Sequence, residues 1–580
     1  MAGKPKAPFY LVVGLVVVGL VGFAAWRSWD VIAPKGNQDA PGTIDKGDLP
    51  QTATAESPDA QGITTVAEPT YVPAQRLAEV RGASDYKALE DNTVRMALNV
   101  WAGWSPVILA NNGHQAGKIW KTPDGEEFKL ELVLIDDPTT MLQTYVSGDV
   151  HLGWGTLDML PLFMEQLVDP SGKPIDSRVM PRIYQQVDWS NGGDGIVVRD
   201  TIKQVSDLRG KKIALAQNSP SHYFALNMLV AGGVQPAEVE FVFTADAFQA
   251  AAAFNSDKSI SACVSWAPDI YNLEKVKGNK MLVTTATANR LIADVWFARA
   301  DFARDHGPKV EAIVRGIFDA VEDLKKQENK QQVAQLMSAF YNIPADETLG
   351  MLGDAYSTGW GDNYQFFMNE NYLANFERVW NNAYSLYGTI RVVTKPRVPY
   401  DQVMDFTYIK KLKGEARYEK QKAPVAQFDP RVMTEQEIEK NTFLTATHYL
   451  HFFPNSSELR RKVSRPDGQG GETEELYDPN VDFVLDKIGE RIGQFETSRI
   501  VIEGHADASM KGEVDEDLVT KLSQARAEAV RDALIKKFSL DPNRFRAIGK
   551  GWKEPADPTE PNNHAQNRRV EVQILPAEGV

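Results

Sequence analysis

Cysteine is almost absent from this sequence of 580 residues, which contains a single one, Cys263. One thiol cannot form an intrachain disulfide, and it cannot supply the paired cysteines of a CxxC zinc site. Because Cys263 lies in the middle of the chain, a lipid anchor on an N-terminal cysteine is excluded as well. HExxH, Walker A and GxSxG motifs are also missing. The sequence therefore predicts no catalytic site, no metal centre and no cofactor, and it favours a protein that is not an enzyme.

Positive charge is scarce too, because 63 Lys and Arg stand against 78 Asp and Glu, for a formal net charge of −15. A nucleic-acid partner needs a basic surface to meet its phosphates, so the charge argues against one. It leaves room for a local basic pocket. A hydrophobic content of 43% over this length predicts several packed domains rather than a disordered chain.

Ionisable residues are missing from residues 9–26, which read FYLVVGLVVVGLVGFAAW. Such a run is near the lower limit for crossing a hydrocarbon core of about 30 Å as a helix. Lys4 and Lys6 precede it, which predicts an N-terminus in the cytoplasm and the bulk of the chain outside. A cleaved signal peptide is the alternative, but the flank AAWRSWD is a poor cleavage site. We therefore expect an uncleaved single-pass anchor, and cleavage is not settled by the sequence.

The chain divides by composition into blocks. Residues 30–84 are rich in Pro, Gly, Thr and Ala without periodicity, and they predict a flexible linker of roughly 40 Å r.m.s. span. A shorter polar stretch separates two globular blocks. The predicted units are the cytoplasmic tip and membrane helix (1–29), the linker (30–84), a two-lobed domain (85–412), a second linker (413–440) and a C-terminal domain (441–580).

The first globular block alternates short β-branched runs with helical patterns, beginning with VRMALNVW and FKLELVLID. Strands separated by helices predict parallel βαβ units, and about 320 residues of this pattern predict two α/β lobes. Ser105 before Pro106, and Ser219 before Pro220, are helix-start signals. Helix N-termini can hold anions, and loops of this kind line the ligand crevice of open α/β sheets. These junctions are either simple caps or parts of a pocket.

The segment DLRGKKIALAQNSPSHYFALNMLVAGGVQPAEVEFVFTADAFQAAAAFNSDKSISACVSWAPDI resembles the nitrate/sulfonate/taurine-type solute-binding proteins of ABC transporters. The resemblance covers about 300 residues and implies a type 2 periplasmic-binding-protein-like clamshell, in which a small anionic solute is expected between the lobes. Enzymes of this fold in thiamine biosynthesis use a cysteine-rich motif, which a single cysteine cannot supply. By position, the resemblance implies that the ligand is met by Trp101, Ser105, Trp154, Thr156, Ser219, Ser221, His222, Trp266 and Asp294.

The last block contains the strand-like run RIVIEG, followed directly by His505 and Asp507. His505 and Asp507 could be metal ligands, or they could hold a charged ligand at a strand end. Further on, residues 518, 522, 525, 529 and 533 are apolar at helical spacing, and Arg526 projects beside that stripe. A partly buried guanidinium requires an acidic partner.

IEGHADASMKG, LSQARAEAVRDAL, NRFRAIGKGWKEP and NRRVEV together resemble the OmpA-like peptidoglycan-binding domain, an α+β fold, over some 130 residues. In that family the equivalents of Asp507 and Arg526 hold the ammonium and carboxylate of diaminopimelate in the peptide stem. Ala506 and Val519 depart from the family, which usually has Thr and Asn there. On this resemblance His505 is a turn and packing residue, not a metal ligand.

The sequence thus predicts a binding protein of the inner membrane whose bulk is periplasmic and attached to the cell wall. Its expected partners are peptidoglycan, a small solute of the oxyanion class, and the inner membrane. The alternative is a solute-binding fold that has lost its ligand and docks an envelope protein partner. The solute, the transporter or complex and the oligomeric state are not indicated.

Overall fold

The computed structural model describes residues 77, 79–466 and 471–577. The predicted membrane span at residues 9–26 and nearly all of the predicted linker 30–84 lie outside this part of the chain. Within it, no helix combines the length and the apolar character needed to cross a bilayer.

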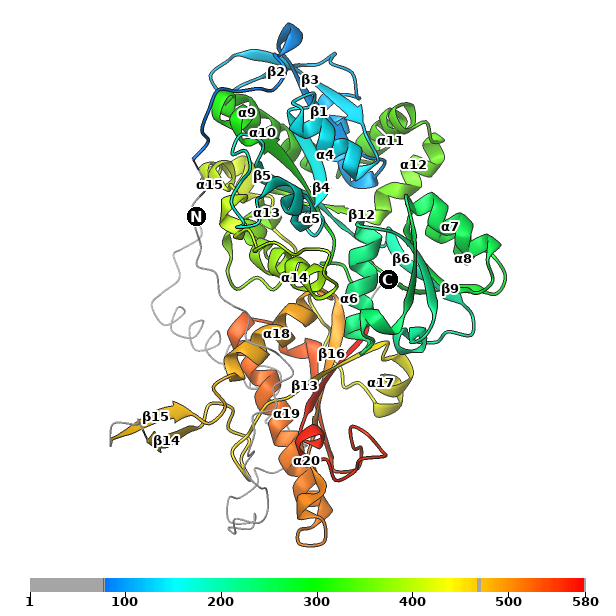
Figure 1. The fold of residues 1–580 in the computed structure, drawn as a ribbon, viewed down its shortest axis with the longest axis vertical. Helices are drawn as coiled ribbons and strands as arrows, with labels where there is room; N and C mark the ends of the chain where they lie inside the picture. Colours follow the sequence, from blue (N-terminus) through cyan, green and yellow to red (C-terminus); the bar gives the residue numbers. More distant parts are fainter. Residues whose placement is uncertain (1–76, 78, 467–470, 578–580) are drawn as a thin grey trace, which may run out of the picture.

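The first lobe is built on a seven-stranded sheet in the order β12-β5-β11-β4-β1-β3-β2 (Figure 1). Strand β1 lies parallel to β3 and β4, whereas β11 is antiparallel to β4 and β5. The strands β4, β5 and β11 are almost wholly buried, and in β5 this includes polar side chains such as Gln185, Gln186 and Asp188. The strands are β1 (Thr93–Leu98), β2 (Ile119–Lys121), β3 (Glu127–Leu134), β4 (Leu152–Thr156), β5 (Pro181–Ser190), β11 (Ala293–Arg299) and β12 (Ala355–Ser357).

Helices surround this sheet on both faces, so its apolar strands are covered from both sides (Figure 1). They include α3 (Ser105–Asn111), α4 (Pro138–Val146), α5 (Leu160–Leu167), α9 (Ala300–Asp305), α10 (Gly307–Asp323), α11 (Gln327–Tyr341), α12 (Ala345–Met351), α13 (Trp360–Met368), α14 (Phe376–Thr389) and α15 (Thr407–Lys411).

The second lobe has a five-stranded sheet in the order β10-β6-β9-β7-β8. Cys263 lies on β9 and is fully buried, and this burial raises the pKa of its thiol to about 12. The elements are β6 (Asp194–Arg199), β7 (Lys212–Ala216), α6 (Pro220–Ala231), β8 (Glu240–Thr244), α7 (Ala247–Ser256), β9 (Ile260–Trp266), α8 (Asp269–Glu274) and β10 (Asn279–Thr284).

The chain crosses between the lobes twice, from β5 to β6 and from β10 back to β11. The buried hydroxyl of Thr285 joins the two crossings. Its Oγ1 accepts the N–H groups of Gly192 and Asp194 at 2.9 and 3.1 Å and lies 2.8 Å from the Ser190 hydroxyl. The predicted two-lobed α/β domain is therefore present, and its chain returns to the first lobe at β11.

The segment 413–440, predicted as a linker, is packed against both neighbouring domains. It contains α16 (Ala416–Glu419) and most of α17 (Glu435–Asn441). Tyr418, Phe428 and Ile438 are buried. Because the segment is mostly polar, its composition does not indicate that these three side chains are buried.

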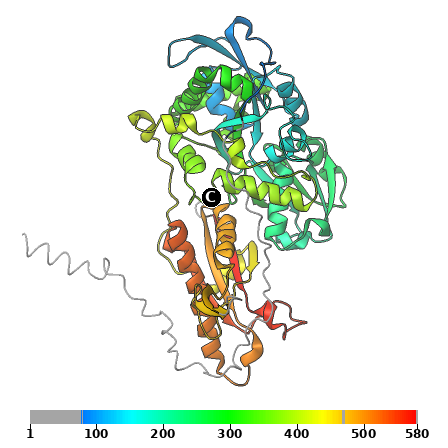
Figure 2. The same cartoon turned by 60° about the vertical axis from the view of Figure 1, so that its left-hand side comes forward.

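The C-terminal domain has a four-stranded sheet in the order β13-β18-β16-β17 with two long helices on it (Figure 2). Helix α19 lies so close to the sheet that a Cβ at Gly504 would sit 2.1 Å from the Ser523 carbonyl oxygen. The elements are β13 (Leu444–His448), β14 (Lys462–Pro466), β15 (Glu472–Leu476), α18 (Val481–Gly493), β16 (Ser498–His505), α19 (Glu516–Phe538), β17 (Phe545–Gly551), α20 (His564–Asn567) and β18 (Val570–Ala577).

The C-terminal domain contacts the crossing segment that leads back to the first lobe. Arg290, whose side chain is 8% exposed, forms an ion pair with Glu496 at 2.6 Å. Its backbone N–H also donates to the Gln494 carbonyl at 3.1 Å. The Asn289 side chain accepts the Glu496 N–H through its Oδ1 and donates to the Thr497 hydroxyl through its Nδ2. The two predicted domains are thus joined by a buried polar interface.

We predict that Glu496→Gln lowers the free energy of unfolding by about 2 kcal/mol, because it leaves the buried Arg290 guanidinium without its counter-charge. Urea denaturation of the full chain measures the change. Glu458→Gln is the control, since Glu458 is exposed and pairs only loosely with Arg461 at 3.7 Å. Equal stability of both variants would show that the ion pair does not hold the interface.

Candidate functional site

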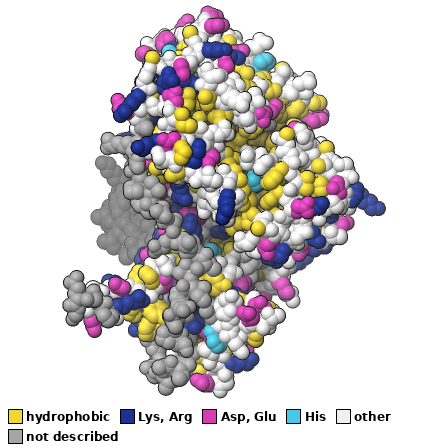
Figure 3. Space-filling model, in the orientation of Figure 1, with side chains coloured by type: hydrophobic (Ala, Val, Ile, Leu, Met, Phe, Trp, Pro, Cys, Tyr) yellow, Lys and Arg dark blue, Asp and Glu magenta, His cyan; other side chains and the backbone are white. Residues whose placement is uncertain are grey.

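A cavity of about 430 Å³ lies between the two lobes. Figure 3 shows apolar side chains gathering in the hollow between the first lobe at the top and the second lobe at the right. Both sheets contribute to its walls, because β4 ends and β11 begins there in the first lobe, whereas β7 and β9 end and β6 begins there in the second. Of the residues predicted to meet a ligand, the cavity is lined by Trp101, Trp154, Thr156, Ser219, Trp266 and Asp294.

The other three predicted ligand residues do not line this cavity. Ser105 lies in a different pocket, and it does not cap α3, because a short 3-10 helix (Ala102–Trp104) precedes it. Ser221 and His222 are buried in the first turn of α6. Ser219 and Pro220, which precede them, line the cavity. Successive residues of a helix point in different directions, so the side chains of Ser221 and His222 lie on another face of α6.

His222 is a core histidine. Its ring packs edge-on against Phe241, Phe243 and Tyr387 at centroid distances of 5.2 to 6.0 Å. Its Nδ1 accepts the Asn218 N–H at 3.3 Å, and burial lowers the pKa of the imidazole to about 4. The ring is therefore neutral.

The charge of the cavity differs from what an oxyanion site requires. Its described lining contains no Lys, Arg or His. It contains five carboxyl groups, of which only that of Asp294 is among the residues predicted from the sequence. Two of them cap helices that open on the cavity: Asp137 accepts the Thr140 N–H, and Asp246 accepts the Gln249 N–H. The carboxyl groups belong to Asp136, Asp137, Asp194, Asp246 and Asp294.

A buried acidic cluster continues behind the cavity wall. In the sheet, Asp294 of β11 stands opposite Asp188 of β5 on one side and Thr156 of β4 on the other. Desolvation, together with the neighbouring carboxyl groups, raises the pKa of Asp294 well above its usual range. Burial also raises the pKa of Asp194 to about 7 and that of Asp158 to about 8.

In the C-terminal domain Asp507 is 1% exposed. Its Oδ1 accepts the Ser509 N–H at 2.6 Å and lies 3.3 Å from His564 Nδ1. Its Oδ2 lies 2.7 Å from Arg568 Nε, an ion pair without the alignment of a hydrogen bond. His564 and Arg568 are further functional candidates. Arg568 belongs to the NRRVEV motif, and the packing of α20 against the turn after Asp507 brings both residues to that carboxylate.

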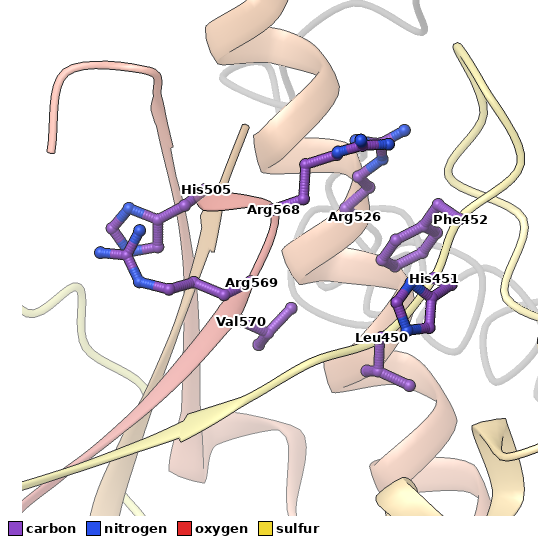
Figure 4. Close-up of a pocket in the computed structure, with 8 residues that line it drawn as sticks. All are labelled: Leu450, His451, Phe452, His505, Arg526, Arg568, Arg569 and Val570. Carbon is purple, nitrogen blue, oxygen red and sulfur yellow. The ribbon is translucent and has the colours of Figure 1, made fainter. Parts of the chain in front are cut away.

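Arg526 lies on the buried face of α19 and is 4% exposed. Its Nε donates to the Ser456 carbonyl at 3.0 Å, and its guanidinium lies 5.0 Å from the centre of the Phe452 ring. Figure 4 shows Arg526 and Arg568 extending toward each other across a small pocket, whereas Arg569 lies beside His505 on the other side of the strand. The pocket thus presents guanidinium groups next to a buried carboxylate.

His505 lies between Glu503 and Glu571, with Nε2 at 4.0 and 3.8 Å from their carboxylate oxygens. Lys550 lies 3.5 Å from Glu503, and Arg569 lies 2.6 Å from Glu571. These cations already neutralise the carboxylates, and desolvation lowers the pKa of His505 to about 3. The arrangement is that of a buried polar network and gives a metal ion little attraction.

Two families match the chain. Residues 183–330 match the NMT1/THI5 like family, and residues 471–569 match the OmpA family. The chain therefore joins a periplasmic solute-binding-protein-like fold to a C-terminal OmpA domain, as the sequence motifs predicted. The curated relatives described below are named as a periplasmic binding protein and an outer membrane protein, and neither name denotes an enzyme.

Among curated proteins, the chain is similar to the taurine-binding periplasmic protein of Escherichia coli, with 28% identity over 235 residues. That match covers 38% of this chain and 68% of the relative. The outer membrane protein Omp38 of Acinetobacter baumannii is 27% identical over 147 residues, which are 25% of this chain and 35% of the relative. The chain thus spans about a third of the length of Omp38.

Among solved structures, the periplasmic aliphatic sulphonate binding protein SsuA of Escherichia coli aligns with a TM-score of 0.43 at 19% identity. The alignment covers 60% of this chain and 98% of SsuA.

The buried acid Asp158 predicts a specific pH dependence. Its folded-state pKa of about 8 lies above the unfolded value near 4, so the folded protein holds the extra proton and loses stability as pH rises between these values. The slope for one such group is at most about 1.4 kcal/mol per pH unit.

Asp158→Asn should therefore reduce the fall in stability between about pH 5 and pH 8. Thermal melting across this range measures it, with Glu347→Gln, an exposed acid on α12, as the control. A variant with the wild-type pH profile would contradict the assignment.

Proposed function

We propose that this protein is a cell-envelope binding protein that holds a small solute between two lobes and attaches non-covalently to peptidoglycan. The observation that carries the proposal is the presence, in one chain, of an interlobe cavity and of an OmpA domain in which Asp507 and Arg526 are both buried. Buried charges of opposite sign next to a pocket are suited to a ligand that brings both charges itself.

The peptidoglycan ligand would be the diaminopimelate of the peptide stem, a zwitterion. Arg526 would accept its carboxylate in a bidentate geometry, and Asp507 would meet its ammonium. Arg568, which already pairs with Asp507, adds positive charge beside Arg526 and supports binding of the carboxylate. The contacts to Ser456 and Phe452 hold the Arg526 guanidinium in place before a ligand arrives.

The same proposal places the chain at the inner membrane. Residues 9–26 would anchor it there, and the linker 30–84 would let the folded part reach the wall. A receptor fixed at both ends cannot diffuse to a distant permease, so a solute bound in the cleft would be sensed or retained locally.

For the wall site, we predict that Arg526→Ala and Asp507→Asn each weaken binding to isolated sacculi by about 2 kcal/mol or more, roughly 30-fold in Kd. Asn at position 507 keeps an oxygen for the Ser509 N–H and removes the charge, so the turn is retained. Co-sedimentation with sacculi measures binding, and melting of the same samples shows that they are folded.

Arg531→Ala and Asp532→Asn are matched controls, because these two residues pair with each other on the outer face of the same helix. Both controls should bind sacculi normally. Full binding by the two site variants would place the wall site elsewhere, with Arg568 and Arg569 as the next residues to test.

For the membrane anchor, we predict that the full chain sediments with inner membranes. External protease added to spheroplasts should degrade the folded part, because it lies outside the cytoplasm. Replacing residues 1–29 with a cleavable secretion signal should release the protein into the periplasmic fraction once the wall is digested. Protection of residues 90–580 from protease would contradict the topology.

A further inference from the structure

The interlobe cavity has a charge pattern that specifies its ligand more narrowly than the fold does. We propose that it binds an organic ammonium ion, that is, a positively charged nitrogen on a small apolar body. This inference rests on the proposed solute-binding function and names the class of the solute.

Carboxyl groups reach the cavity from both lobes. Asp294 enters from the first lobe and Asp194 from the second, and they are 4% and 3% exposed. Asp194 is held in place by the Ser190 hydroxyl, which donates to its Oδ2 at 2.6 Å. Desolvated acids are costly to ionise, and a cation bound between them supplies the missing counter-charge. No basic side chain among the described lining residues competes for that place.

Aromatic rings form much of the remaining wall. The first lobe contributes two tryptophans to the cavity wall, and the indole N–H of each has a partner within the protein. Trp101 Nε1 lies 3.3 Å from each Asp188 carboxylate oxygen, and Trp154 Nε1 donates to the Ile135 carbonyl at 2.9 Å. Trp266 adds a third indole from the second lobe, opposite Asp194 in the β6–β9 pair. Indole rings within about 6 Å of a cation attract it, and tryptophan does so most strongly.

Thr156 provides an independent sign that a polar ligand group belongs here. Thr156 lines the cavity and is 2% exposed, and its hydroxyl has no partner with hydrogen-bond geometry among the described residues, although it lies near enough to Asp158 to lower the pKa of that acid. Buried hydroxyls are normally hydrogen-bonded. An ammonium N–H between Asp294 and Thr156, which stand opposite each other in the sheet, would satisfy it.

An oxyanion without a positive charge finds little in the cavity to hold it. The helix N-termini of α4 and α7 are already capped by Asp137 and Asp246. Helix α6 begins with Pro220, which has no N–H, and the Ser219 hydroxyl donates to the Ala216 carbonyl at 2.8 Å. An added anion would also meet five carboxyl groups.

The test uses the full chain in detergent at fixed ionic strength, with calorimetry and thermal melting against matched probes. Choline is compared with its uncharged carbon isostere, dimethylbutanol, and taurine is compared with ethanesulfonate, which lacks the amino group. We expect at least one ammonium-bearing probe to bind and raise the melting temperature, whereas its matched partner does neither.

Asp294→Asn and Asp194→Asn should each weaken that binding at least tenfold, and Glu347→Gln, on the exposed face of α12, should leave it unchanged. Binding of ethanesulfonate equal to that of taurine would overturn the ammonium assignment and leave the solute-binding function in place. Binding of no probe, in a protein that still sediments with sacculi, would overturn both the ammonium assignment and the solute-binding half of the proposed function.

Discussion

The hydroxyl of Thr285 holds together the point where the chain passes twice between the lobes. It accepts two backbone N–H groups from one crossing while it belongs to the other, and it is fully buried. Asp194 ends one crossing, and its backbone N–H is bonded to this hydroxyl, whereas Asp294 stands just beyond the other crossing and is held by the pairing of β11 with β4 and β5. The cavity therefore receives one acid from the end of each crossing.

The same junction also carries the contact with the C-terminal domain. Asn289 and Arg290 lie between Thr285 and Asp294 in the sequence, and they meet residues 494–497 on the other side. Acidic groups thus face the cavity, while the guanidinium of this segment points away from it to Glu496. Because Arg290 pairs with Glu496, its guanidinium does not enter the cavity, where it would neutralise the carboxyl groups.

Much of the architecture could be predicted from the sequence, because strand and helix periodicity and the linked motifs are local properties. Trp101, Trp154 and Trp266, which the family resemblance predicts to meet a ligand, line the cavity. Asp194 could not be found this way, since it becomes part of the site only when two distant crossings meet. Ser105 was misplaced because a 3-10 turn, which the Ser-Pro signal does not reveal, starts the helix one turn early.

The C-terminal domain shows a similar limit. The helix of residue 526 is present, but of the predicted apolar stripe only Leu522 is buried. Val519, Val530 and Leu534 complete the buried face, and Arg526 lies within that face rather than beside it. Alanines can occupy either face of a helix, so their spacing alone does not fix its rotation. Packing of α19 against Gly504 decides it, and that contact is tertiary.

The burial of Cys263 has a practical consequence for observing this molecule. Its thiol is enclosed within the sheet of the second lobe, and burial raises its pKa to about 12, so it is almost entirely in the unreactive protonated form at neutral pH. A maleimide dye would therefore select any new cysteine placed on the surface, without prior removal of the native one. Pairs of dyes on the two lobes could report their separation in the otherwise unaltered chain.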